Sequence, residues 1–135
     1  MKRGLYCSLI LFVIACCLPA LEWNKAGQPN DAMYGLQVLV VGWSGIFAGV
    51  IAWYANPLWA FGLFFGALRK PVLTAVVGAL AIAIGATTIA WIAKELPADE
   101  GGVTKMAIVR LLPGCYVWFA SLAVLPIAAL LPKTK

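Results

Sequence analysis

The sequence predicts an all-α integral membrane protein, with four transmembrane helices in a bundle and a short interfacial or re-entrant helix after Asn56-Pro57. Of its 135 residues, 64% are hydrophobic and only 11% are charged, and the mean hydropathy is +0.96. A soluble domain of this length needs more charged surface. The apolar segments provide about four spans of roughly 20 residues and leave no room for a separate soluble domain. We therefore expect a single transmembrane domain over residues 1–135.

The first predicted span covers residues 5–21 and follows the basic residues Lys2 and Arg3. A basic start before an apolar run is also typical of secretory signals, and Val13-Ile14-Ala15-Cys16 is similar to a bacterial lipobox, whose cysteine is lipidated after cleavage. The run stays apolar beyond Cys17, whereas a mature lipoprotein begins with a polar tether. We expect a retained span, with processing at Cys16 as the alternative.

The second predicted span covers residues 34–55, which carry no charge. Its glycines Gly42, Gly45 and Gly49 leave one side bare, and the last two have the four-residue spacing that lets membrane helices approach closely. The pattern indicates a helix that packs on protein along its glycine side.

The dipeptide Asn56-Pro57 should end or kink that helix, because proline has no amide hydrogen and disfavours the α conformation of the preceding residue. Residues 58–68 are too few to cross a bilayer as a helix. We expect a short interfacial or re-entrant helix there, in which Gly62 and Gly66 repeat the glycine spacing. One long kinked helix over 34–68 is the alternative.

The third predicted span covers residues 72–93. Small residues that include Ala79 and Ala83 fall on one stripe of this helix, and large residues such as Leu80 and Ile84 fall largely on another. Small residues allow close helix contact, so we expect the alanine stripe to pack on protein and the large stripe to meet lipid.

The fourth predicted span covers residues 106–131 and is interrupted at Pro113-Gly114. Arg110 would then lie about one turn inside its outer end. A charge within the membrane suggests a functional role by default. The alternatives are that Arg110 extends to the lipid headgroups or pairs with a loop carboxylate such as Glu22 or Glu95.

Few side chains could carry chemistry. The sequence has no histidine, which excludes a zinc site or haem ligation through histidine, and neither paired carboxylates nor a phosphate-binding glycine loop occurs. We predict no catalytic residue, no metal and no cofactor. The only plausible polar group on the outer half of the predicted bundle comprises Gln37, Ser44, Arg110 and Tyr116.

The charge distribution predicts the topology. Four crossings from a cytoplasmic N-terminus would leave six basic and no acidic residues inside, a positive-inside pattern. These six are Lys2, Arg3, Arg69, Lys70, Lys133 and Lys135. We expect solvated outer-loop charges at Glu95, Asp99 and Glu100 rather than a cation site. Basic residues at span ends do not form a nucleic-acid surface.

The sequence thus predicts a small multi-pass protein of the bacterial inner membrane, with both termini cytoplasmic and no enzymatic activity. We expect it to act as an accessory subunit or an immunity-type protein that binds another integral membrane protein, or itself, through small-residue helix faces. The alternative is a small transporter or channel protomer that oligomerises to form a path. A lipid-modifying enzyme that uses Arg110 and Tyr116 has the least support.

Overall fold

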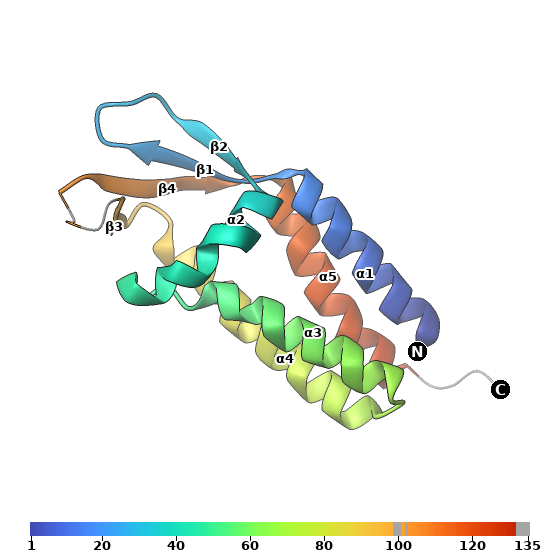
Figure 1. The fold of residues 1–135 in the computed structure, drawn as a ribbon. Coiled ribbons are helices and arrows are strands. Elements are labelled where there is room, and N and C mark those ends of the chain that lie inside the picture. The colour runs from blue at the N-terminus through green and yellow to red at the C-terminus, as the bar shows by residue number, and fades with distance from the viewer. Residues whose placement is uncertain (99–100, 102, 132–135) are drawn as a thin grey trace.

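The computed structural model describes residues 1–98, 101 and 103–131. Over these residues the chain forms a mixed α/β fold with five α-helices and one four-stranded antiparallel sheet (Figure 1). The predicted all-α bundle of four transmembrane helices is therefore wrong. One expected span, 34–55, is interrupted by non-helical backbone, and the outer ends of two others, 5–21 and 106–131, are strands.

The helices run in chain order with three 3₁₀ segments beside them. They are α1 (Lys2–Cys17), α2 (Gly35–Val41), η1 (Gly42–Ala48), η2 (Ala52–Tyr54), α3 (Ala55–Ala67), α4 (Pro71–Ala86), η3 (Thr87–Trp91) and α5 (Pro113–Leu130). The strands are β1 (Pro19–Lys25), β2 (Asp31–Tyr34), β3 (Glu95–Pro97) and β4 (Lys105–Leu111), in the sheet order β2-β1-β4-β3.

The helix of the expected first span ends early, and that of the expected fourth span begins late, because part of each span is a strand. Helix α1 stops at Cys17, and Pro19 opens β1. Residues 105–111 form β4, in which Ile108 is buried and Val109 is 41% exposed. Successive side chains of a strand point to opposite faces, which accounts for the difference between these two residues. Helix α5 begins only at Pro113. Proline is tolerated in the first turn of a helix because the amide hydrogen that it lacks would have no acceptor within the helix.

Residues 34–55 form no continuous helix. Helix α2 passes into η1, which ends at Gly49 with φ +80°, a left-handed conformation that favours glycine. Helix α3 then begins at Ala55 and includes Pro57 in its first turn, so the proline starts a helix rather than ending one. The alternative of one kinked helix over 34–68 is also wrong.

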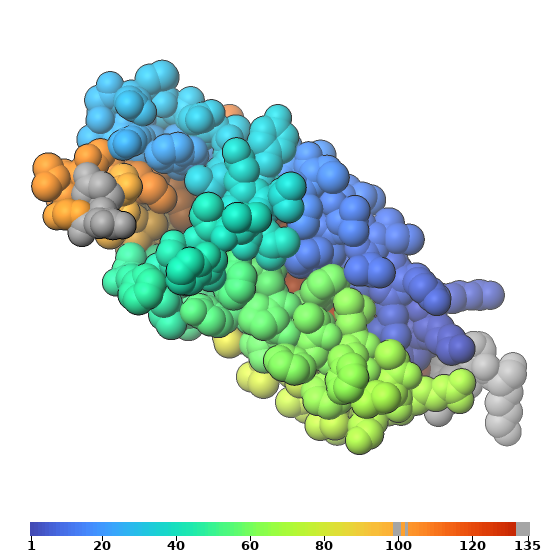
Figure 2. Space-filling view, in the orientation of Figure 1, coloured from blue at the N-terminus to red at the C-terminus, as the bar shows by residue number. Residues whose placement is uncertain are grey.

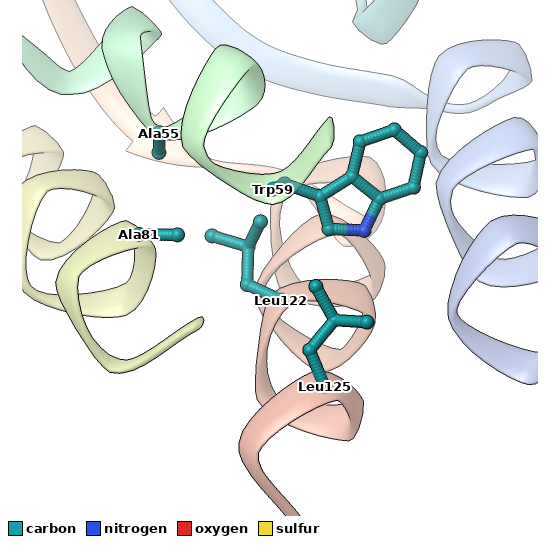
Figure 3. Packing of buried hydrophobic residues seen from close by; sticks show 5 residues of the cluster. All are labelled: Ala55, Trp59, Ala81, Leu122 and Leu125. Carbon is teal, nitrogen blue, oxygen red and sulfur yellow. The ribbon is translucent and has the colours of Figure 1, made fainter. Parts of the chain in front are cut away.

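Two helical segments, Pro71–Trp91 and Pro113–Leu130, are long and apolar enough to cross a membrane. In the row of long helices, α1 packs on α5, α5 on α4, and α4 on α3. Figure 3 shows the buried cluster where α3, α4 and α5 meet. Its members are Ala55, Trp59, Ala81, Leu122 and Leu125.

The sheet lies at one end of these helices (Figure 1). The N-terminus, the turn between α3 and α4, and the last turn of α5 lie at the opposite end. Segment α2–η1 crosses between the two parts, and Figure 2 shows it in teal over the junction of sheet and helices. The molecule thus has an apolar helical part and a sheet that carries most of its described acidic residues.

Candidate functional site

A cavity of about 600 Å³ lies between the sheet, segment α2–η1 and the adjoining ends of α1, α3 and α5. The sheet contributes the side chains of its buried face, among them Ala20, Leu96 and Ile108, each only 7% exposed. The helical part contributes Phe12 and Trp118. The volume falls within the range of about 300–1,000 Å³ that small-molecule sites occupy.

The indole N–H groups of Trp53 and Trp118 form hydrogen bonds between different segments of the cavity wall. The Trp118 Nε1 group on α5 donates to Asn56 Oδ1 at the start of α3, over 2.9 Å. The Trp53 Nε1 group donates to the Leu39 carbonyl over 2.8 Å and so ties η2 to α2. Both tryptophans thus present ring surface to the cavity with their N–H groups already bonded.

The chemistry of the cavity is apolar. None of the residues that line it is acidic or basic. Within the described part of the chain, every fully buried side-chain nitrogen or oxygen has a hydrogen-bond partner. The cavity can therefore take a hydrophobic group, and it has no acid, base or nucleophile–base pair for a reaction.

The polar side chains expected to act together lie apart. Gln37 Oε1 accepts from the Tyr34 backbone amide, and the Ser44 hydroxyl donates to the Val41 carbonyl. Arg110 lies on β4, outside any helix, and Tyr116 is 62% exposed on α5. The four residues thus lie on four different elements, α2, η1, β4 and α5.

Arg110 instead forms a cross-strand ion pair. Its Nε donates to the carboxylate of Glu22, the residue opposite it on β1. The Asn30 side chain donates to the other carboxylate oxygen over 2.9 Å. The hydrogen bond from Asn30 and then the bond from Arg110 lower the pKa of Glu22. The second candidate partner, Glu95, bonds to Lys105 over 2.6 Å.

The predicted packing glycines of α3 contact neighbours within the chain. A Cβ atom at Gly62 would lie 2.8 Å from Leu125 Cδ1, and one at Gly66 would lie 2.5 Å from Leu5 Cδ2. Both glycines are buried, so their bare faces are already covered by α5 and α1.

The glycines of η1 allow close contacts around the cavity. A Cβ at Gly42 would lie 2.6 Å from Trp53 Cδ1, and one at Gly45 would lie 3.1 Å from Val50 Cβ. Gly49 supplies the left-handed backbone that ends η1. The bare side of this segment therefore packs within the chain.

Helix α4 packs on protein through a different stripe from the one expected. The buried residues of α4 and η3 follow a spacing of four and three: Thr74, Gly78, Ala81, Gly85 and Thr88. A Cβ at Gly78 would lie 2.7 Å from Pro126 Cδ on α5. Ala79 and Ala83 are exposed. The alanine stripe thus faces away from the rest of the chain.

Sequence reasoning did not identify the cavity, because its walls come from segments distributed over most of the chain. No alternation indicated strand β4, because its apolar residues 106–109 are consecutive. Within the described residues, no three Cys, Asp or Glu side chains gather as metal ligands. Asp99 and Glu100 lie outside the described residues.

No family model, curated protein or solved structure matches this chain.

Proposed function

We propose that this chain is a small, non-catalytic, multi-pass protein of the bacterial cytoplasmic membrane that binds a helix of another membrane protein along α4. Membrane embedding is supported by the exposure of its apolar helices. In the most apolar windows of Pro71–Trp91 and Pro113–Leu130, only 28% and 33% of residues are buried. A core helix of a soluble protein is mostly buried, so these outward apolar side chains suit contact with lipid.

The proposed topology has both ends of the chain in the cytoplasm. The end of the molecule opposite the sheet carries Lys2, Arg3, Arg69 and Lys70, and no acidic residue among those described there. The sheet carries Glu22, Asp31 and Glu95 together with Lys25, Lys105 and Arg110, so its described charges balance. This asymmetry agrees with the tendency of basic residues to stay on the cytoplasmic side.

The observation that carries the binding proposal is a second, exposed stripe on α4 and η3. Its residues repeat at intervals of four and three, the spacing at which one helix packs along another. They are Val72, Val76, Ala79, Ala83, Ala86 and Ala90, all exposed. The stripe has the same periodicity as the buried one, and its small residues would let a second membrane helix approach closely.

The test is site-specific photo-cross-linking in living cells with benzoylphenylalanine at Ala83, and at Ala60 on α3 as the control. Ala60 is also exposed but lies outside the α4 stripe. We expect a cross-linked product with another membrane protein from position 83 and none from position 60. Adding Ala79→Leu, one turn away on the same stripe, should remove most of the product because leucine holds the partner backbone away.

Two results would contradict the proposal. Absence of any protein product at position 83 would leave α4 without a partner. A product of twice the mass of the chain would identify the partner as a second copy rather than a different protein.

A further inference from the structure

We infer that the cavity between the sheet and the helices binds the acyl chain of a membrane lipid. This inference rests on the proposed embedding of the helices in a bilayer, and it assigns a ligand to a part of the molecule that the proposed partner helix on α4 does not use. Three independent properties of the cavity carry it: its chemistry, its size and its opening.

The chemistry excludes a charged or strongly polar ligand. No acidic or basic side chain lines the cavity, and the indole N–H groups of Trp53 and Trp118 already donate to Leu39 and Asn56. A polar ligand that left water for this site would find few free partners, which is costly. An alkyl chain has no such requirement, so the lining favours it.

The size of the cavity suits a single alkyl chain, since its volume lies in the range that small-molecule sites occupy. The cavity holds about 600 Å³. A flexible alkyl chain is thinner than a helix and can follow the space between the sheet and segment α2–η1.

The opening of the cavity is apolar. Phe47 and Val41 both line it, and they are 84% and 50% exposed. The cavity also reaches Trp91 and Gly114, which lie at the sheet ends of the two candidate spans. A lipid beside those helices would therefore have apolar walls of the cavity close to its acyl chain.

The experiment uses the purified full chain in phosphatidylcholine nanodiscs that contain a small fraction of phosphatidylcholine with a diazirine on one acyl chain. After irradiation, adducts are located by peptide mass spectrometry. We expect adducts in the cavity segments that contain Val38 and Met106, and also on the exposed face of α4 around Val76.

The decisive variant is Ala48→Phe, which adds a ring at a half-buried position of the cavity wall. We expect about a tenfold loss of cavity adducts, the factor that corresponds to about 1.4 kcal/mol of binding free energy. The matched control, Ala60→Phe on the exposed face of α3, should leave them unchanged. If Ala48→Phe does not fold by circular dichroism, Val38→Trp fills the same cavity from α2.

The outcomes separate this inference from the proposed function. Adducts on α4 without adducts in the cavity would overturn lipid binding and leave the embedding intact. Cavity adducts that persist unchanged in the filled variant would also overturn it. If neither α4 nor the cavity is labelled, both the embedding and the inference fail.

Discussion

The buried hydroxyl of Ser8 on α1 forms hydrogen bonds with both α3 and α5. Ser8 is fully buried; it donates to the Ser121 carbonyl of α5 over 2.7 Å and accepts from Trp59 Nε1 of α3 over 2.9 Å. The Trp59 ring also stacks on Phe12, with ring centroids 3.9 Å apart. A single small side chain on α1 therefore satisfies the polar atom of the largest residue in the core.

Replacing Ser8 with alanine should destabilise the fold by about 1–2 kcal/mol, because the buried Trp59 N–H then lacks an acceptor. The control is Ser44→Ala, whose hydroxyl is exposed and bonds only within its own segment; it should change stability by less than about 0.5 kcal/mol. Unfolding by sodium dodecyl sulfate in mixed micelles, followed by circular dichroism, measures both. Equal midpoints would refute a role for the buried bond.

At the scale of elements, the pairing of β1 with β4 connects the two ends of the sequence. Glu22 lies opposite Arg110, 88 residues later in the chain. The Glu22 side chain is 17% exposed, whereas that of Arg110 is 69% exposed. The bond thus lies at the sheet surface, where it sets strand register and adds less to stability than a buried pair would.

The pKa of Glu22 predicts how the sheet responds to acid. Hydrogen bonds from Asn30 and Arg110 lower this pKa from its ordinary value of 4.5. The ionised carboxylate therefore stabilises the folded state above that value, and the contribution is lost as the pH falls through the folded-state pKa. In Glu22→Gln no such loss can occur.

We therefore expect the stability difference between the wild-type chain and Glu22→Gln to shrink between neutral pH and the acid range below 4.5. Unfolding midpoints across this range measure it. Lys25→Gln, which neutralises a charge on the same strand, is the control and should keep a constant difference from wild type. A Glu22→Gln difference that does not vary with pH would contradict the assignment.

Helix α4 shows how one element can offer two interfaces. Its buried stripe packs against α5 through Gly78 and Gly85, where Pro126 and Trp118 fill the space that a Cβ would need. Its second stripe repeats the same spacing and is exposed. Periodicity alone identifies both stripes, but only the packing distinguishes which one is covered.

At the scale of the whole molecule, the sheet and the basic end lie at opposite ends of the long helices (Figure 1). The proposed topology predicts that Cys introduced at Gln28, in the exposed turn between β1 and β2, reacts with a membrane-impermeant maleimide on intact cells. Cys introduced at Lys70, in the α3–α4 turn, should react only after lysis. Both changes are made in a chain whose four native cysteines are replaced by alanine.

Labelling in the reverse order would overturn the orientation. Labelling of both positions on intact cells would contradict the membrane embedding itself. The cysteine-free parent chain is the control for background reaction.

Local patterns identified the helices whose composition is uniform over a full helix length. The expected span 72–93 corresponds to the observed segment Pro71–Trp91, and the apolar run after Pro113 forms α5. They failed for short apolar runs, since a run of about four to eight residues fits a strand as well as a piece of helix. Residues 106–109 are such a run between Lys105 and Arg110, and they form part of strand β4.

Local patterns also failed to predict the arrangement of the candidate site. The predicted polar group around Arg110 assumed that its members came from two membrane helices of one bundle, whereas Arg110 lies on strand β4. The cavity could not be predicted, because it exists only once β1, β4 and α2–η1 are brought together over the helix ends.

The sequence by itself determined which helices are long and apolar enough to cross a membrane, and where basic residues gather between them, because composition and helix length are local properties. Only the tertiary structure decided that the ends of the first and fourth apolar runs become a sheet. The hydrogen-bond partners of β1 lie in β2 and β4, and the residues of β4 that pair with β1 are more than 80 residues away along the chain. A local sequence pattern does not indicate whether two segments so far apart in the chain will pair as strands.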